Sequence, residues 1–154
     1  MPSVETKYFG TLPCAAESVF DFPRGLPAFE DEKTFVLIEA PRGEGLVFLQ
    51  SMTRASLCFV AFPIQLVDQN YQLAIAPEDL EDLGLDAGCQ PVLGGQVLVL
   101  ALLSLRDELP ATANLMAPIA LNVKTGCGVQ AIRRDSRYSH EHPVAVRPAG
   151  EEAC

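Results

Sequence analysis

Short β-forming runs, interrupted by proline and glycine at close intervals, constrain this chain more than any other feature. The runs consist mainly of Val, Ile, Leu, Phe and Tyr, which are enriched in strands, and several alternate in polarity. The breaks between them carry turn signals, such as PRGLP at 23–27, PRGEG at 41–45 and TGCG at 125–128. The predicted strands are Val4–Phe9, Ser18–Phe22, Thr34–Glu39, Leu46–Ser51, Leu57–Phe62, Tyr71–Ile75, Val97–Leu105, Ile119–Lys124 and Val129–Arg133.

Strands of this number and spacing predict a mostly β fold: a small, antiparallel, β-barrel-like single domain with one or two short helices. The chain has 154 residues, which suits one domain, and residues from about 144 to 154 are expected to form a flexible tail. The apolar run VLVLALLSL, Val97–Leu105, is interpreted as a central strand covered on both faces. A buried helix is the competing interpretation, and the run is too short to cross a bilayer.

The charge of the chain limits its partners. It has 11 Lys and Arg against 20 Asp and Glu, so the formal net charge is 11 − 20 = −9. This charge argues against direct nucleic-acid binding, because phosphates would be repelled, and it suits a basic protein partner. Solubility alone is the simpler explanation of the charge. The beginning of the chain has no signal-peptide pattern, so a cytoplasmic location without membrane contact is expected.

The segment APEDLEDLGL predicts a short helix with an acidic outer face. Pro77 suits the first turn, where its missing N–H costs nothing, and Gly84 suits the position just after the helix end. Leu80 and Leu83 are spaced to face the sheet together. The acidic residues of the helix are Glu78, Asp79, Glu81 and Asp82. They are candidate protein-binding residues, although such a run is often only a solvated helix face.

Nothing in the sequence indicates catalysis, a metal or a cofactor. The common nucleophile, phosphate-loop, zinc-protease and dinucleotide motifs are absent. His140 and His142 could share one face of a strand and hold a metal, but a third ligand is missing and the segment reads as a surface tail. Cys58 lies among apolar residues that would raise its pKa, so it is interpreted as a small hydrophobe. The five cysteines, with no CxxC pair, are expected as free thiols.

Two polar or turn-forming groups are interpreted as structural. In PRGLP, Pro23 and Pro27 stiffen a loop and Gly25 supplies a positive φ, although a partner-facing loop tip is the alternative. The run TANLMAPIALN (112–122) contains two amides in an apolar stretch. Its polar and turn residues are Asn114, Pro118 and Asn122. We expect the amides to hydrogen-bond backbone groups around a proline break, since an unpaired buried amide costs about 1–3 kcal/mol.

Several segments together resemble the flagellar assembly factor FliW family. They occur in the family's order from Glu5 to about Val144, which is nearly the whole chain. The matching segments are ETKYFG, FDFPRGLPAFEDEKTFVL, FLQS, APEDLEDLGL, TANLMAPIALNVKTGCGVQAI and DSRYSHEHPV. The resemblance implies a small, mostly antiparallel β-barrel-like domain without catalytic activity. It also implies binding to the translational regulator CsrA, which is thereby held off its mRNA, and to flagellin as the alternative partner, so that flagellin translation follows filament assembly.

The chain departs from the family pattern at two places that bear on function. Ala28 stands where the family has the second glycine of its turn, so a positive φ there would strain the backbone. The family's Pro-Asp-Tyr-Glu-like stretch reads Gln69-Asn70-Tyr71-Gln72 here, with fewer acids, and Tyr71 and Gln72 are candidate CsrA contacts on that edge. The alternative to a regulatory factor is a small barrel that binds an apolar ligand or an unidentified protein.

Overall fold

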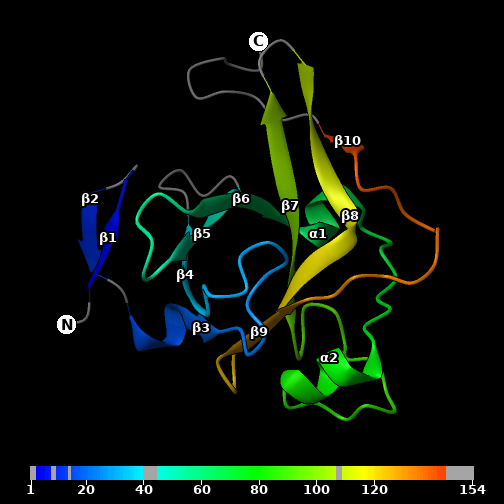
Figure 1. Ribbon diagram of the computed structural model, residues 1–154. Helices are drawn as coiled ribbons and strands as arrows, with labels where there is room; N and C mark the ends of the chain where they lie inside the picture. The colour runs from blue at the N-terminus through cyan, green and yellow to red at the C-terminus, as the bar shows by residue number, and fades with distance from the viewer. Residues whose placement is uncertain (1–2, 8–9, 14, 40–44, 107–108, 145–154) are drawn as a thin grey trace.

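The computed structural model describes residues 3–7, 10–13, 15–39, 45–106 and 109–144, and Figure 1 shows their arrangement. The strands are β1 (Ser3–Thr6), β2 (Gly10–Pro13), β3 (Val19–Asp21), β4 (Thr34–Glu39), β5 (Val47–Ser51), β6 (Cys58–Pro63), β7 (Leu98–Arg106), β8 (Leu109–Asn122), β9 (Cys127–Gln130) and β10 (His142–Val144). The helices are a 3-10 turn, η1 (Ala16–Ser18), and two short α-helices, α1 (Ile64–Val67) and α2 (Pro77–Asp82). This mostly β composition confirms the predicted fold class.

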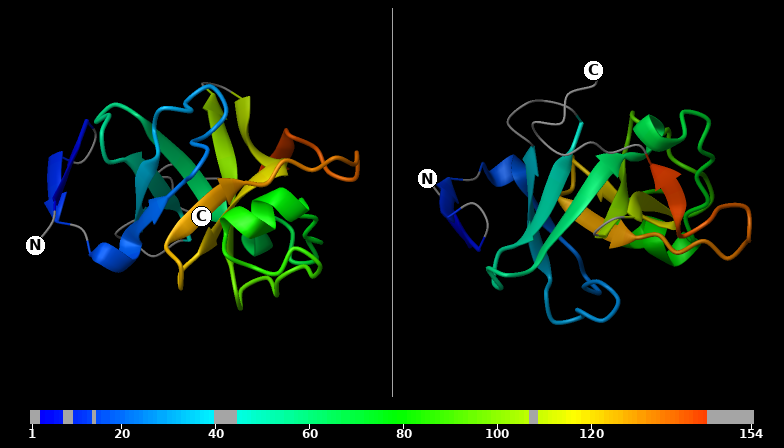
Figure 2. Two further views of the ribbon diagram at one scale, coloured as in Figure 1. Left: turned by 60° about the horizontal axis from the view of Figure 1, so that its bottom comes forward. Right: turned by 90° about the horizontal axis from the view of Figure 1, so that it is seen from above.

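The strands β3 to β9 form a closed barrel, because each pairs with the next along the chain and β9 also pairs with β3. All neighbours are antiparallel except β3 and β9, which meet in parallel at Asp21 and Cys127. β10 pairs with the first half of β8, outside the ring. The β1–β2 hairpin forms a sheet of its own and lies on the opposite side of the barrel from α2 (Figures 1 and 2).

The barrel is filled by its own side chains. The largest interior side chains are Phe20, Phe22, Phe35, Leu49, Leu100, Ile119 and Leu121, all 2% exposed or less. Phe22 and Phe35 meet edge to face with their ring centroids 5.3 Å apart, a favourable aromatic geometry. β7 explains the fully apolar run: Leu100 points into the barrel, while Val99 and Ala101 belong to a second cluster outside it. The predicted central strand with two covered faces is therefore confirmed.

The second cluster lies on the outer face of β7 and β8. Its buried members from the covering segments are Ile64 of α1, Tyr71 and Ile75 of the following segment, and Leu80 and Leu83 of α2 and its end. The two leucines of α2 do face the sheet, as their spacing predicts. This small helix has no side-chain hydrogen bond at its N-cap, Ala76, and the packing of its leucines helps to hold it in place.

α2 ends as the sequence predicts. Gly84 has φ +78°, its N–H donates to the Glu81 carbonyl, and the Leu85 N–H donates to the Leu80 carbonyl over 2.9 Å. These two bonds form a Schellman motif, which needs a residue in the left-handed conformation. A side chain at this position would also meet Thr125, whose Cγ2 lies 3.0 Å from an added Cβ.

The proline break predicted in TANLMAPIALN is a large bulge of four residues inside one strand. Leu102 of β7 pairs with Asn114, and Leu100 pairs with Ile119, so residues 115–118 of β8 lie opposite Ala101 alone. The predicted strand start at Ile119 is therefore wrong: β8 begins at Leu109 and continues through Pro118. A proline cannot donate to a ladder, and the bulge is where the strand tolerates it.

Side chains satisfy the backbone of this bulge. The Asn114 Oδ1 accepts the N–H groups of Met116 and Ala117, each over 3.0 Å. The Leu115 carbonyl accepts the Tyr71 hydroxyl, and the Ala117 carbonyl accepts the Gln130 Nε2. The backbone hydrogen bonds of the bulge are completed by Leu115 N–H to Ser139, Arg133 N–H to Met116 and Ala131 N–H to Pro118. Asn114 thus makes the backbone contacts that the sequence predicts.

The predicted strand Tyr71–Ile75 is wrong. These residues are outside the sheets, although their segment is fixed by side chains at both ends. The Gln90 amide bonds both the N–H and the C=O of Ile75 over 2.9 Å, and the Gln72 N–H donates to the Tyr138 hydroxyl. These side chains supply backbone hydrogen bonds that a neighbouring strand would otherwise supply. The segment can therefore stay outside the sheets although its sequence alternates like that of a strand.

The ends of the chain differ from the predictions. β1 stops at Thr6, and the rest of the predicted strand Val4–Phe9 lies partly outside the described residues. The segment read as a surface tail contains β10, which pairs Pro143 with Thr112. Val144 ends β10, and the remainder of the predicted flexible tail lies outside the described residues.

We expect Asn114→Ala to lower the free energy of unfolding by about 2 kcal/mol, because the Met116 and Ala117 N–H groups lose their acceptor. Asn114→Asp keeps an oxygen at the same place and is the matched control. Urea denaturation of both variants checks this. Equal losses in the two variants would show that the acceptor is not what stabilises the bulge.

Ala28→Gly is expected to stabilise the protein by about 0.5–1 kcal/mol, the left-handed strain of alanine less the added chain entropy of glycine. Among the described residues, Ala28 is the one non-glycine with positive φ, at +70°. Gly25→Ala is the contrasting variant, because its φ is +63° and an added Cβ would lie 2.5 Å from the Glu30 carbonyl oxygen. Urea denaturation should give opposite signs for the two, and a destabilised Ala28→Gly would refute the strain.

Candidate functional site

The acidic face of α2 is presented at one end of the barrel, close to the turn PRGLP. An open hollow of about 220 Å³ separates the two, and it brings together Arg24 and Pro27 of the turn with Asp79 and Asp82 of the helix. Glu30 and Gln130 also line it. The predicted acidic residues and the predicted turn are therefore neighbours in space, which their separation in the sequence does not reveal.

Two arginines neutralise half of the acidic face. Arg24 Nε lies 2.8 Å from Asp82 Oδ2, and Arg134 Nη2 forms an ion pair with Glu78 Oε1. No hydrogen bond or ion pair is recorded for the side chains of Asp79 and Glu81, both of which lie in the described part of the chain, although Arg24 and Arg134 act on the Asp79 charge electrostatically. Of the four predicted contact residues on α2, these two carboxylates are therefore the ones without an ion pair.

Among the four acids of α2, Asp79 is the one whose environment disfavours its charged form. Burial, together with the neighbouring Glu78 carboxylate, raises the pKa of Asp79 above its ordinary value of 3.8. Hydrogen bonding to its own backbone in the first turn lowers the pKa of Glu78, and Arg134 adds to this effect. A cation that approached Asp79 would relieve a charge that the fold holds at a cost.

Asn122 attaches α2 to the barrel. Its Nδ2 donates to the Leu83 carbonyl at the end of the helix over 2.8 Å, and its Oδ1 accepts the Lys124 N–H over 3.0 Å. The Thr125 hydroxyl donates to the same Leu83 carbonyl. The second amide of TANLMAPIALN thus holds the candidate binding helix against the end of β8.

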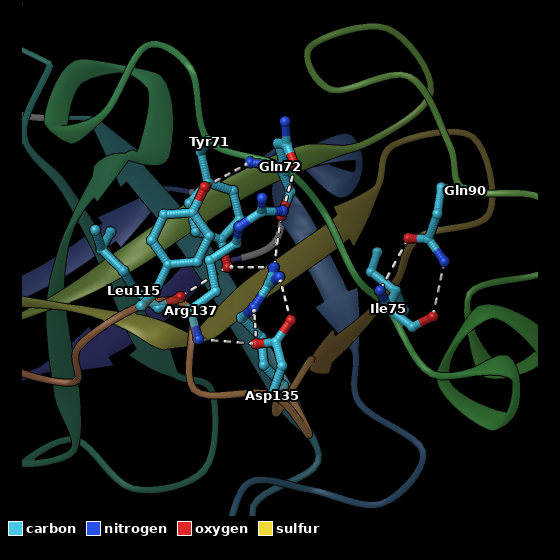
Figure 3. Close-up of polar contacts among 9 residues, drawn as sticks. Tyr71, Gln72, Ile75, Gln90, Leu115, Asp135 and Arg137 are labelled. Carbon is cyan, nitrogen blue, oxygen red and sulfur yellow. Dashed lines mark hydrogen bonds and ion pairs between the residues drawn. The ribbon is translucent and has the colours of Figure 1, made fainter.

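Tyr71 and Gln72, the other predicted contacts, belong to a polar hub beside α2 (Figure 3). Tyr71 is 6% exposed, and its hydroxyl donates to the Leu115 carbonyl over 2.7 Å. A side chain so buried is not available for direct contact with a partner and can act only by positioning other groups. Burial raises the pKa of Tyr71. Gln72 is exposed, and its Oε1 accepts the Arg137 Nη1.

Arg133 is the centre of this hub, and it is 4% exposed. Its guanidinium forms a two-pronged pair with Asp135, at 2.9 and 2.8 Å, and donates to the Gln72 carbonyl over 2.5 Å. The same group lies over the Tyr138 ring, 4.8 Å from the centroid. The hydrogen bond from Arg133 lowers the pKa of Asp135, so the buried cation keeps its counter-ion.

The sequence did not reveal the residues of this hub other than Tyr71 and Gln72. Arg133 stands in RRDSR, which reads as a solvated basic run, and a buried arginine is rare. One signal was present: Arg133 and Asp135 are two residues apart, so they share a face of an extended segment. Gln90 lies in the segment between α2 and β7, which carries turn residues, and its amide holds Ile75.

The alternative catalytic residues are not brought together. His140 lies 3.6 Å from Glu141, and His142 begins β10. Burial raises the pKa of the Cys58 thiol, which disfavours the nucleophilic form. Over the described ranges, no three His, Cys, Asp or Glu side chains are grouped as metal ligands would be, and no helix has the length and apolar character needed to cross a bilayer.

The closed barrel is filled by its own side chains, and this places the chain in the class of small β-barrel domains without an interior ligand site among the described residues. Comparison with known proteins identifies the family. The family model described as FliW protein matches residues 3–144.

Named relatives extend over nearly the whole chain. The flagellar assembly factor FliW of Bacillus subtilis (strain 168) is 31% identical over 98% of this chain and 99% of its own length. That of Leptospira biflexa is 33% identical over 89% of this chain and 87% of its own. A crystal structure of the flagellar assembly factor FliW has a TM-score of 0.79 at 28% identity, covering 92% of this chain and 96% of its own. The chain belongs to the FliW family.

Asp79→Asn is expected to raise the melting temperature at neutral pH. The folded-state pKa of Asp79 is raised, so the folded state binds this proton more tightly than the unfolded state does. The cost of the charge is therefore absent below about pH 4 and develops as the pH rises through the raised pKa. Thermal melts at about pH 3.5 and pH 7 check this, since the advantage of Asn should appear only at pH 7.

The matched control is Asp82→Asn, which removes the same charge from the same helix but also breaks the ion pair with Arg24. It should not stabilise the protein at neutral pH. A gain for both variants, or a gain of Asp79→Asn that persists at low pH, would show that the environment of Asp79 is not the cause.

Proposed function

We propose that this protein is a flagellar assembly factor that acts in the cytoplasm by binding a CsrA-like translational regulator and holding it off its mRNA. Flagellin is the alternative partner, and its binding releases the regulator, so that flagellin translation follows filament assembly. The curated relatives are named flagellar assembly factors, which supports the general role. The specific partners rest on the family resemblance and on the chemistry of the acidic surface.

The observation that supports this proposal best is the state of the four acids on α2. Glu78 and Asp82 are paired with arginines, while Asp79 and Glu81 are left to interact with another molecule. The whole chain has a formal net charge of −9, so it would attract a basic RNA-binding protein at long range. At contact, that protein would meet the carboxylates of α2 that form no ion pair. The hollow between α2 and the turn gives a basic side chain a place beside Asp79.

An acidic helix beside an RNA-binding protein also repels phosphates. The two effects of the same charges can be separated, because close contacts hold the complex whereas the phosphate repulsion acts at longer range. We therefore expect the charges of α2 to matter more for the exclusion of RNA than for the formation of the complex.

The double variant Asp79→Asn, Glu81→Gln tests this while it leaves both arginine pairs in place. We expect the affinity for the purified CsrA-like protein to fall about three- to tenfold, the effect of two exposed charge pairs, and RNA competition to weaken more than that. The measurements are calorimetric titration and a competition assay with a labelled RNA target at two salt concentrations, since screening should reduce both effects.

The matched control is Glu17→Gln, Glu39→Gln, which removes the same number of charges from exposed positions outside α2. Both properties should change little. Equal losses of affinity and of RNA exclusion in the α2 variant would refute the phosphate repulsion. Failure of the unchanged protein to bind either the CsrA-like protein or flagellin from its own organism, with all components folded, would refute the proposed function.

The alternative of a barrel that holds an apolar ligand has less support. The interior is occupied by Phe, Leu and Ile side chains, and the hollows of about 220–360 Å³ lie at the surface between elements. A ligand would have to displace a packed core, which is costly.

A further inference from the structure

Arg24 reaches from the turn PRGLP to the acidic helix, and its side chain is 64% exposed. It lines the hollow beside α2 together with the carboxylates of Glu30, Asp79 and Asp82. The formal charge of this lining is 1 − 3 = −2. The residues that face the hollow therefore attract a cation by themselves, and one cation, from the chain's own turn, already lies there.

The contact between Arg24 and Asp82 is close but poorly directed. Arg24 Nε lies 2.8 Å from Asp82 Oδ2, which is within the range of an ion pair. The same oxygen is shielded from solvent, yet it accepts no hydrogen bond from any described residue. By contrast, Arg134 Nη2 donates a hydrogen bond to Glu78 Oε1 on the same helix. Because charge-assisted hydrogen bonds depend on direction for their strength, Arg24 leaves part of the binding capacity of Asp82 unused.

The Arg24 side chain can leave Asp82 without disturbing the turn. The backbone of the turn has its own hydrogen bond, from the Gly25 N–H to the Phe22 carbonyl over 2.9 Å. An ion pair with one partner mostly exposed contributes little to stability, because water screens it and a long side chain must be held in one geometry. A better-directed cation therefore has only a weak contact to displace.

We propose that Arg24 forms an autoinhibitory contact: its guanidinium occupies the place over Asp82 that a basic side chain of a partner takes, and it moves aside when the partner binds. A guanidinium or ammonium group on a protein side chain fits this place, because the hollow already holds such a group from its own chain. The incoming cation also meets Asp79, which forms no ion pair with Arg24.

The contact sets how tightly a partner is held. Only the fraction of molecules in which Arg24 has left Asp82 is ready to bind, and the apparent affinity falls by that fraction. This inference rests on the proposed function for the identity of the partner, and it names a residue that opposes binding at the same surface. Removal of Arg24 should therefore raise affinity, whereas loss of an ordinary contact or of a structural residue lowers it.

The probe is the acetylated, amidated tripeptide Gly-Arg-Gly, titrated into the full chain and followed by NMR at the amides of α2. We expect Arg24→Gln to bind it two- to fivefold more tightly than the unchanged protein, the range that one exposed ion pair accounts for. Arg54→Gln is the matched control, because it removes the same charge from an exposed arginine that does not line the hollow. Its affinity should equal that of the unchanged protein. The tripeptide with citrulline in place of arginine has the same shape without the charge and should not bind.

Equal affinities of the unchanged protein and the Arg24→Gln variant overturn the proposal, and so does an equal gain in the Arg54→Gln variant. The same holds if no variant binds the tripeptide, or if the citrulline peptide binds as tightly. Displacement has a direct readout as well. Saturating tripeptide should shift the Arg24 Nε resonance of the unchanged protein toward that of a free arginine side chain, and a resonance that stays in place while the tripeptide binds overturns the proposal.

The same variants are then titrated with the purified CsrA-like protein. A two- to fivefold gain for Arg24→Gln, absent in Arg54→Gln, supports autoinhibition in the proposed complex. A gain with the tripeptide and none with the regulator supports the internal competition and overturns its part in that complex. Failure of the regulator to bind any variant counts against the proposed function, while the tripeptide result stands.

Discussion

The structure depends on satisfying the backbone where Pro118 interrupts β8. β8 pairs with both β7 and β9, so it closes the barrel, and a proline within it removes a donor that the ladder would use. The four residues opposite Ala101 would be left unpaired in an apolar setting. Asn114 accepts two of their N–H groups, while Tyr71 and Gln130 serve two carbonyls. The bulge in β8 thereby forms hydrogen bonds with three other segments, which contain Tyr71, Gln130 and Ser139.

The candidate functional surface follows from that junction. Tyr71 reaches the bulge with its hydroxyl, and Arg133 lies against the Tyr71 ring with its guanidinium 5.5 Å from the centroid. Arg133 in turn holds Gln72, and the chain continues from there into α2. At the far end of β8, Asn122 binds the carbonyl that ends the helix. The acidic helix is therefore held at both ends by groups that also stabilise the barrel.

The packed interior and the ion pairs on α2 together define the outer surface of the barrel. A filled barrel offers no interior site, and the arginine pairs reduce the acidic face to two available carboxylates. One of them, Asp79, is partly buried and near other acids, so its negative charge lowers the stability of the fold at neutral pH.

Local patterns in the sequence determined the β class, the strand Thr34–Glu39 to the residue, the apolar central strand, and α2 with its glycine end. These features depend on neighbours along the chain: alternation, turn chemistry and helix signals. They also marked the two asparagines as backbone anchors, while the family resemblance marked Ala28 as a position that would be strained if its φ were positive. Only the tertiary structure decided that Tyr71–Ile75 is fixed by side chains instead of a strand, that Arg133 is buried, and that Arg24 and Arg134 neutralise half of the acidic helix. Each of these depends on a partner 15 to 66 residues away, and no local pattern specifies which distant group will satisfy a backbone amide or a charge.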